Sequence, residues 1–371
     1  MKFKKIKQQN LISIAIIFML YSCATSKNNM QNTSIKTTSV NAKFEPIGGE
    51  CLFFIGQDLK AIGGLDTYSD GYCDHFEIPA GVTLYTGFAK GTASFGYTQK
   101  GNDGIKTIAN WGAEDSCAQC YVDNQNFKHS MIAIGLSLVG NEKKVAKGKH
   151  DALIKELGEW IKAIERPVFL RIGYEFDGWD WNNYNKEDFL ASWKRIHSMF
   201  TEMNVNNVAF VWQSKGTGSG QDILEEWYPG DALVDWCGYS YFNNPDEEML
   251  IFARKHKKPV FIAEATPILF DETQFFDTIL TNPTQAKQAW EDWFVPFIKT
   301  LNDNKDVIKA FSYINVNWTE QPMWINNPLF KHVDSRIQES EFISKKWREE
   351  MSKPRYLKPS PKLWSNLRDK N

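Results

Sequence analysis

Eight short apolar stretches, separated by longer amphipathic segments, restrict the fold of this sequence more than any other feature. Each stretch is rich in Val, Ile, Leu, Phe and Tyr and has the length of a buried strand. The stretches are Cys51–Ile55, Val82–Thr86, Met131–Leu138, Pro167–Ile172, Val208–Trp212, Val234–Tyr241, Pro259–Ala263 and Ile308–Val316. Buried strands that alternate with helices predict a parallel sheet of the α/β class, and eight strands favour closure into a (β/α)8 TIM barrel.

The segments between these strands carry helical patterns. Apolar residues recur at i, i+3 and i+4 over residues 151–164 and 186–203, which is typical of one buried helix face. Two further helices are predicted, one opening at Pro245 and one over 283–301. No glycine-rich phosphate loop follows any strand, which weakens a nucleotide-binding interpretation. We therefore expect one barrel domain over residues 47–345 and a C-terminal helix and tail over residues 346–371.

The N-terminus has the composition of an export signal. Residues 1–10 carry four Lys and no acid, and the apolar run over 11–20 is too short to span a membrane. The run ends in Leu-Tyr-Ser-Cys23, which resembles the lipobox of bacterial lipoproteins, in which the Cys receives the lipid. We expect a signal peptide over 1–22, lipidation of Cys23, and a polar, flexible tether over 23–46. A plain signal peptide with a chance Cys is the alternative.

This N-terminus predicts an exported bacterial lipoprotein, held by its lipid at the periplasmic or outer face of the outer membrane. The whole chain has 43 Lys and Arg against 45 Asp and Glu, a formal net charge of -2. That balance predicts no nucleic-acid partner and no membrane contact apart from the lipid.

The cysteines after the lipobox suggest disulfides, because export favours their oxidation. Cys51, Cys73, Cys117 and Cys120 are enough for two bridges, although their pairing is not readable from the sequence. Cys117 and Cys120 also have the spacing of a redox pair, but no strand-to-helix context supports that role. No second pair stands at zinc-ligand spacing, so we predict structural disulfides and no metal or cofactor.

Two glutamates stand where predicted strands end. Glu175 follows the fourth strand and Glu264 ends the seventh. The carboxyl ends of barrel strands meet on one rim, which is where such barrels place their chemistry. Glycoside hydrolysis requires two carboxyl groups there, one protonated and one ionised, and retention of configuration requires them about 5–5.5 Å apart. Structural ion-pair residues at a barrel rim are the alternative interpretation.

Glutamates on the fourth and seventh strands are the arrangement of the clan A glycoside hydrolases. Within that clan the sequence resembles family twenty-six, the β-mannanase and β-1,3-xylanase group. The stretch Arg171-Ile-Gly-Tyr174-Glu175 keeps the Arg and Glu spacing of that family's Arg-Pro-x-His-Glu, and Asp177-Gly-Trp179 resembles the segment that follows. The resemblance implies that Glu175 is the acid/base and Glu264 the nucleophile. Tyr174 replaces the family's His, so a sister family of the clan is an alternative.

The residues that we expect at the substrate are mostly aromatic, because flat rings suit the apolar faces of sugars. The expected substrate-binding residues are Arg171, Tyr174, Asp177, Trp179, Trp181, Trp212, Tyr239, Tyr241, Asn317 and Trp318. Arg171 would orient Glu264 and lower its pKa. Asp177 would accept a sugar hydroxyl or pair with Arg171. The resemblance implies that Tyr241 donates a hydrogen bond to the nucleophile.

Together these features predict a retaining endo-glycoside hydrolase that cleaves an extracellular polysaccharide by a two-carboxylate double displacement. The resemblance implies β-mannan or β-xylan as substrate. The change at Tyr174 leaves a marine polymer such as sulfated fucan, carrageenan or β-1,3-xylan as an alternative. A non-catalytic, glycan-binding surface lipoprotein is the competing class, and the presence of both Glu175 and Glu264 argues against it.

Overall fold

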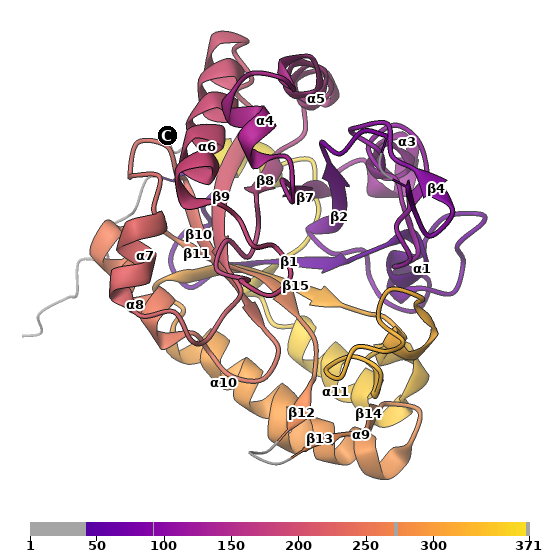
Figure 1. Cartoon of the computed structure of the whole chain (residues 1–371). Coiled ribbons are helices and arrows are strands. Elements are labelled where there is room, and N and C mark those ends of the chain that lie inside the picture. Colours follow the sequence, from indigo (N-terminus) through magenta and orange to yellow (C-terminus); the bar gives the residue numbers. More distant parts are fainter. Residues whose placement is uncertain (1–41, 92, 271–273, 369–371) are drawn as a thin grey trace, which may run out of the picture. The chain divides into compact units, whose positions relative to one another are not determined.

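A computed structural model of the chain describes residues 42–91, 93–270 and 274–368 (Figure 1). The expected signal peptide, the expected lipidation at Cys23 and residues 23–41 of the expected tether lie outside the described residues. Among the helices that are described, none has the length and apolar character needed to cross a membrane.

Eight parallel strands form a closed barrel. Their order is β15-β11-β10-β9-β8-β7-β2-β1, and pairing of β15 with β1 closes the sheet. The barrel strands are β1 (Cys51–Gly56), β2 (Gly81–Gly87), β7 (Met131–Ser137), β8 (Val168–Ile172), β9 (Val208–Ser214), β10 (Trp236–Tyr241), β11 (Val260–Ala265) and β15 (Ile308–Ile314). Each predicted strand is present, so the (β/α)8 barrel is confirmed.

Helices alternate with the barrel strands along the chain and lie around the outside of the barrel (Figure 1). They are α1 (Leu59–Ile62), α2 (Tyr72–His75), α3 (Ala118–Asp123), α4 (Glu142–Ala146), α5 (Asp151–Ile164), α6 (Lys186–Glu202), α7 (Gln221–Trp227), α8 (Glu247–His256), α9 (Pro283–Ala289), α10 (Val295–Asp303), α11 (Glu341–Met351) and α12 (Leu363–Arg368). α8 begins after Pro245 rather than at it, because the Asp246 side chain caps the helix by accepting from the Met249 N–H. The segment predicted as one helix over 283–301 is α9 and α10, joined by a π-helical turn at Trp290–Phe294.

Short strands occur in the loops and at the base of the barrel. They are β3 (Ala93–Ser94), β4 (Tyr97–Thr98), β5 (Ala109–Asn110), β6 (Asp115–Ser116), β12 (Leu269–Phe270), β13 (Phe275–Phe276), β14 (Thr278–Ile279), β16 (Val333–Asp334) and β17 (Tyr356–Leu357). β17 pairs in parallel with the first residues of β1.

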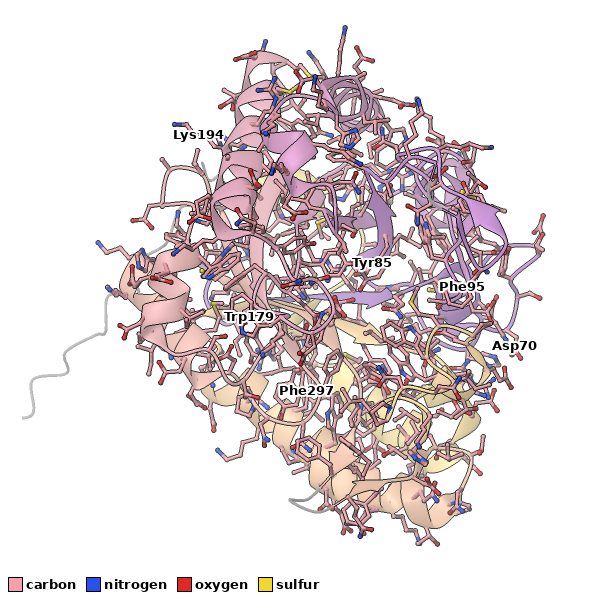
Figure 2. All side chains as sticks on the ribbon, in the orientation of Figure 1. Asp70, Tyr85, Phe95, Trp179, Lys194 and Phe297 are labelled. Carbon is pink, nitrogen blue, oxygen red and sulfur yellow. A yellow bond between two sulfur atoms is a disulfide. The ribbon has the colours of Figure 1, made fainter. Side chains whose placement is uncertain are left out.

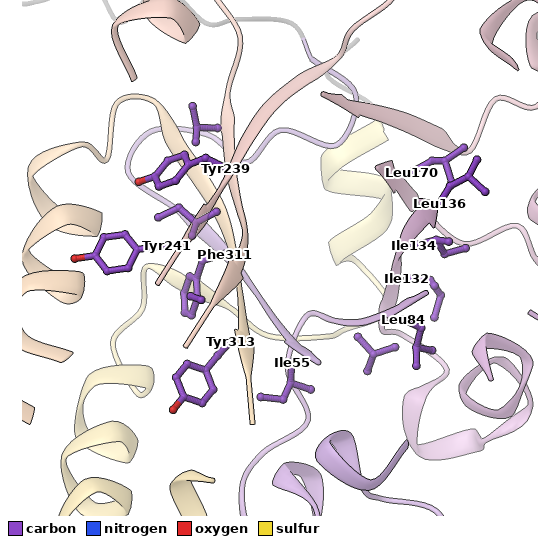
Figure 3. Close-up of a cluster of buried hydrophobic side chains, with 14 of the residues drawn as sticks. Ile55, Leu84, Ile132, Ile134, Leu136, Leu170, Tyr239, Tyr241, Phe311 and Tyr313 are labelled. Atoms are coloured by element: carbon purple, nitrogen blue, oxygen red, sulfur yellow. The ribbon is translucent and has the colours of Figure 1, made fainter. Parts of the chain in front are cut away.

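Alternation along the strands divides the core into two parts. Outward side chains such as Ile134 and Tyr239 point away from the space between the strands (Figure 3) and pack in the layer that includes the helices. Inward side chains such as Phe54, Phe169 and Trp236 form a second, aromatic cluster. Because the start of each strand is filled this way, polar chemistry is restricted to the carboxyl ends of the strands.

Both ends of the described chain pack against this inner cluster. Phe44 is buried against Phe169, and the backbone carbonyl of Lys43 accepts from the Trp236 indole N–H at 2.8 Å. Leu363 of α12 joins the same cluster. Residues 42–46, which we expected to belong to the tether, therefore reach the barrel, because Phe44 buries its ring there.

The cysteines form one bridge among the described residues, between Cys117 and Cys120, with 5.5 Å between their Cα atoms. The other two disulfide candidates, Cys51 and Cys73, are free thiols, so the expectation of a second bridge among these four cysteines is wrong. Cys51 is buried in β1, where its Sγ donates to the Leu52 carbonyl, and Cys73 packs from α2 against the core. Each fills a separate place in the core as a small apolar side chain.

Candidate active site

A cavity of about 500 Å³ lies at the carboxyl ends of the strands, and both predicted glutamates line it. Its walls come from the segments at the ends of all eight barrel strands. That volume falls in the range of small-molecule sites. The aromatic side chains that line it are Tyr85, Trp111, Tyr174, Trp181, Phe242, Trp318, Trp324 and Phe330, of which Tyr85 is labelled in Figure 2. A glutamate pair among aromatic walls is an arrangement suited to sugar chemistry.

Glu175 is held on a short turn just after β8. Its backbone φ is 52°, in the left-handed region that residues other than glycine seldom adopt. Its Oε1 accepts from the Ser240 hydroxyl at 2.7 Å, and its Oε2 accepts from the Trp181 indole N–H at 2.8 Å. Strained backbone that the surroundings hold in place is frequent at functional sites. The carboxyl group of Glu175 is thus fixed at both oxygens.

Glu264 is held by a buried cation. Its Oε1 accepts from Nη1 of Arg171 at 2.8 Å and from Nε2 of Gln213 at 3.3 Å. The Arg171 side chain is fully buried on the inner face of β8, with its guanidinium 4.9 Å from the ring centre of Tyr85 and 5.3 Å from that of Tyr174. A cation and an amide donor thus hold this oxygen of Glu264 in place, and the bond from Arg171 is charge-assisted.

A chain of side chains connects the two glutamates. Nε2 of Gln213 donates to Oγ of Ser240 at 3.0 Å and also reaches Glu264, while Ser240 donates to Glu175. Oε1 of Gln213 accepts from Arg171 at 3.0 Å. The two carboxyl groups therefore share one buried polar network, in which each has its own set of donors.

The position of Glu264 relative to Ser240 depends on an irregularity in the pairing of β10 with β11. Tyr239 pairs with Ile262, but the next residue, Ser240, pairs with Glu264, so one residue of β11 is skipped. A bulge of this kind re-aims the side chains that follow it. It brings Glu264 onto the inner face after Ala263, which already faces inward. Ser240 and Glu264 therefore lie opposite each other on the inner face of the barrel.

The environment of Glu175 raises the pKa of its carboxyl group. Burial raises the pKa of Glu175 to about 8, and the negative charge of Glu264 adds to that rise, while the hydrogen bonds from Ser240 and Trp181 oppose it. Glu175 is therefore protonated near neutral pH, while Glu264 accepts hydrogen bonds from Arg171 and Gln213. Two carboxyl groups with different protonation states in one site are what acid/base and nucleophilic catalysis require.

Comparison with known proteins agrees with this chemistry. The chain is 34% identical over 349 residues to a β-1,3-xylanase of a Vibrio species, a match that covers 89% of this chain and 70% of that protein. It is 31% identical over 382 residues to a β-1,3-xylanase of an Alcaligenes species, covering 97% and 73%. The chain belongs to the family of these β-1,3-xylanases. No family model matches the sequence.

The solved structures that resemble this glycosidase agree in fold. A family-26 β-mannanase from Bacteroides ovatus matches with a TM-score of 0.53 and 15% identity, covering 84% of this chain and 91% of that one. A modular endo-β-1,4-mannanase from Cellulomonas fimi matches with a TM-score of 0.52 and 12% identity, covering 85% and 74%. The β-1,3-xylanase relatives confirm the resemblance that the two glutamate segments predict, and these family-26 structures agree with it in fold.

Several predicted substrate residues lie in the cavity of the glycosidase. Tyr174, Trp181 and Trp318 line it, and Trp318 is stacked on Phe330 with 4.2 Å between the ring centres. Arg171 lies behind Glu264 rather than in the cavity wall. Trp181 is half exposed, so its ring remains available at the cavity mouth while its N–H donates to Glu175.

Three predicted residues point away from the cavity, because they occupy outward positions of their strands. Trp212 is buried and stacked on Phe176 with 4.5 Å between the ring centres. Tyr239 and Tyr241 point away from the barrel interior (Figure 3). The ring of Tyr241 packs against Trp293 and Phe297. The expected hydrogen bond from Tyr241 to the nucleophile is therefore wrong, since the inward residue of this segment is Ser240.

Three other predicted residues lie outside the cavity. The carboxylate of Asp177 accepts from the Lys215 N–H at 2.7 Å and from the Ser219 hydroxyl at 2.6 Å, so it anchors the segment after β9 rather than pairing with Arg171. Trp179 is partly exposed and packs on Trp227. Asn317 caps a short 3₁₀ turn and lines a separate, smaller pocket.

The sequence analysis missed two residues of the polar network, Gln213 and Ser240. Period-two counting from the inward residue Ala209 places Gln213 on the inner face of β9. The same counting from Trp236 along β10 reaches Ser240. Both signals are present in the sequence, although aromatic residues at the neighbouring, outward positions led to a different assignment.

The network predicts different effects for neighbouring changes in β10. Ser240→Ala removes a hydrogen bond that favours the charged form of Glu175, so the pKa of Glu175 should rise. We expect the alkaline limb of the kcat/KM profile to move upward by roughly one pH unit. Tyr241→Phe removes a hydroxyl that faces away from the site, and should leave that limb in place. A shift in Tyr241→Phe but not in Ser240→Ala would contradict the observed inward and outward assignment.

Proposed function

We propose that the chain is a retaining endo-β-1,3-xylanase, exported and held at the cell envelope by a lipid on Cys23. The observation that carries the catalytic proposal is the pair of buried carboxyl groups in one cavity. The pKa of Glu175 is raised to about 8, whereas Glu264 accepts from Arg171. Export and lipidation rest on the pattern of residues 1–23.

In the proposed first step, a carboxylate oxygen of Glu264 attacks the anomeric carbon and forms a covalent glycosyl ester. The bond from that carbon to the leaving oxygen breaks, and Glu175 gives its proton to the leaving oxygen. In the second step, the Glu175 carboxylate takes a proton from water, whose oxygen attacks the same carbon and releases Glu264. Two inversions at one carbon restore its configuration, which gives a product with retained configuration.

The neutral substrate is supported by the charges at the cavity. Among the described residues that line it, Lys215 is the single cation, whereas Asp58, Glu114, Glu175 and Glu264 are acids. One lining cation offers little for the sulfate groups of a fucan or carrageenan to pair with, so a sulfated chain is disfavoured. The relatives that share 31–34% identity are β-1,3-xylanases, and this points to β-1,3-xylan among the neutral polysaccharides. The aromatic walls provide faces on which sugar rings of such a chain stack.

A reducing-end assay on a polysaccharide panel tests this proposal. The panel contains β-1,3-xylan, β-1,4-xylan, β-mannan, a β-glucan, carrageenan and a sulfated fucan. We expect rapid release of oligosaccharides from β-1,3-xylan, and proton NMR of the first product should show the β-anomer. Preferred cleavage of another polymer would overturn the substrate, and an initial α-anomer would overturn retention. Binding of a polymer without cleavage would favour the glycan-binding protein.

The raised pKa of Glu175 predicts the alkaline limit of activity. The first step requires the protonated acid, so kcat/KM on a natural xylo-oligosaccharide should fall tenfold per pH unit above about pH 8. An aryl xyloside whose leaving group needs no proton provides the control. With that substrate the alkaline limb should disappear. Glu175→Gln should retain most of its kcat/KM, whereas its kcat should fall because the second step loses its base. An alkaline limb that is equal for both substrates would assign the pKa of about 8 to another group.

A further inference from the structure

A second, polar pocket of about 310 Å³ adjoins the catalytic cavity. Asp58 and Glu114 line both spaces, whereas Glu175 and Glu264 line only the first. The second pocket lies beyond the carboxyl ends of β1 and β15, among Asn317, Gln321 and the segment 67–70. A ligand in it would therefore sit beside the reacting sugar without being the reacting sugar.

The floor of this side pocket holds an unused acceptor. The Gln321 side chain is fully buried, and within the described parts of the chain its Oε1 has no hydrogen-bond partner. Its Nε2 makes one long contact of 3.4 Å with Oδ2 of Asp58, whose other oxygen accepts from the Ala61 N–H at 2.7 Å. A buried amide oxygen without a partner is costly, and a hydroxyl donor in the pocket would satisfy it.

The cations of the side pocket are already neutralised. Arg336 donates two hydrogen bonds to Asp334, at 2.9 and 2.8 Å, and lies 3.2 Å from Glu339. Lys60 lies 3.6 Å from Glu114 and 3.3 Å from Glu320. The pocket therefore has no cation reserved for a sulfate or carboxylate ligand. Its open acceptor and the half-buried ring of Tyr68 suit a neutral ligand with several hydroxyl groups and an apolar face.

We propose that this side pocket binds a single neutral sugar unit that branches from the polysaccharide chain in the catalytic cavity. The proposal rests on the proposed function, because the main chain must first occupy that cavity. The Gln321 carbonyl accepts from a hydroxyl of the branch, Asp58 accepts from a second hydroxyl at the junction of the two spaces, and Tyr68 contacts the ring face. The enzyme would then prefer a sparsely branched neutral chain to a linear one.

Binding measurements on the Glu264→Gln protein test this preference, because the probes are not cleaved. The probes are linear β-1,3-xylotetraose, the same chain with one pentose branch, and the same chain with one sulfate. We expect the branched probe to bind about tenfold more tightly than the linear one, and the sulfated probe to bind no better. Equal affinity for the branched and linear probes, or an equal gain from the sulfate, would overturn the proposal.

Two exposed positions of one loop provide a matched pair of variants. Ser69 lines the side pocket, whereas Asp66 does not, and both side chains are exposed, so a bulky residue at either leaves the core intact. Ser69→Trp should remove the advantage of the branched probe while binding of the linear probe is kept. Asp66→Trp should keep both. An advantage that survives Ser69→Trp would show that the branch binds elsewhere.

A crystal soak with D-xylose separates failure of this proposal from failure of the proposed function. If linear β-1,3-xylan is neither bound nor cleaved, the proposed substrate is wrong, but the side pocket can still hold a sugar. Xylose in contact with Gln321 in the wild type, and absent from Ser69→Trp, would support the pocket as a neutral-sugar site. An empty side pocket in the soaked wild-type crystal would overturn it.

Discussion

Glu264→Gln should reduce kcat on β-1,3-xylan by at least about 10⁴-fold while the binding of xylo-oligosaccharides changes little. The change keeps the size of the side chain and its contacts with Arg171 and Gln213, but an amide cannot form the covalent intermediate. The measurement is the initial rate of reducing-end release, combined with calorimetric titration of a linear oligosaccharide. The thermal unfolding midpoints of the wild type and of Glu264→Gln are compared to check that the variant is folded.

Asp180→Asn is the matched control for this loss. Asp180 is an exposed acid in the segment after β8, close in sequence to Glu175, and it lines neither cavity. We expect its rate to stay within about twofold of wild type. A Glu264→Gln protein that retains a tenth of the wild-type rate would contradict the nucleophile assignment. A comparable loss in Asp180→Asn would show that negative charge near the rim, rather than the identity of one carboxylate, determines the rate.

Arg171→Met should destabilise the protein by about 3–5 kcal/mol and also abolish activity. Arg171 is fully buried and donates to Glu264, so its removal leaves a buried carboxylate without its cation. Arg171→Lys keeps the charge but loses the planar group that contacts the rings of Tyr85 and Tyr174. Its stability should fall between those of the wild type and Arg171→Met. Urea unfolding followed by tryptophan fluorescence measures the free energy of unfolding for each variant.

A double variant tests the physical cause of this loss. In Arg171→Met combined with Glu264→Gln the uncompensated charge is gone, so the loss in stability should be smaller than in Arg171→Met alone. Arg195→Met provides an exposed comparison, because the Arg195–Asp151 pair is more than a third exposed on both sides, and should cost less than about 1 kcal/mol. Strictly additive losses in the double variant would contradict the buried ion pair as the source.

Local patterns were enough for the architecture and the main chemistry. Strand and helix periodicities depend on neighbouring residues, and the closed barrel follows from their order. The α5 helix has the bounds that its apolar spacing predicts, Asp151–Ile164. Glu175 and Glu264 could be assigned to one rim, because parallel strands in a barrel bring their carboxyl ends together.

The side-chain directions at the rim were harder to predict. Trp212 was expected at the substrate because it ends a strand run, but strict alternation places it outward with Phe176. In β11 the bulge opposite β10 has no local sequence signal, and it places Glu264 on the inner face directly after Ala263, opposite Ser240. Asp177 likewise found its donors in a segment 38 and 42 residues later.

The sequence by itself thus determined the barrel, the two glutamates and the aromatic surroundings, because hydrophobic periodicity and the meeting of strand ends are local or topological properties. Only the tertiary structure decided how those glutamates are charged and held. The pKa of Glu175 depends on its burial and on the charge of Glu264, a residue 89 positions away. The position of the Glu264 carboxylate depends on the hydrogen bond from Arg171 across the barrel. Burial and charge interactions act through space, and the folded chain sets those distances.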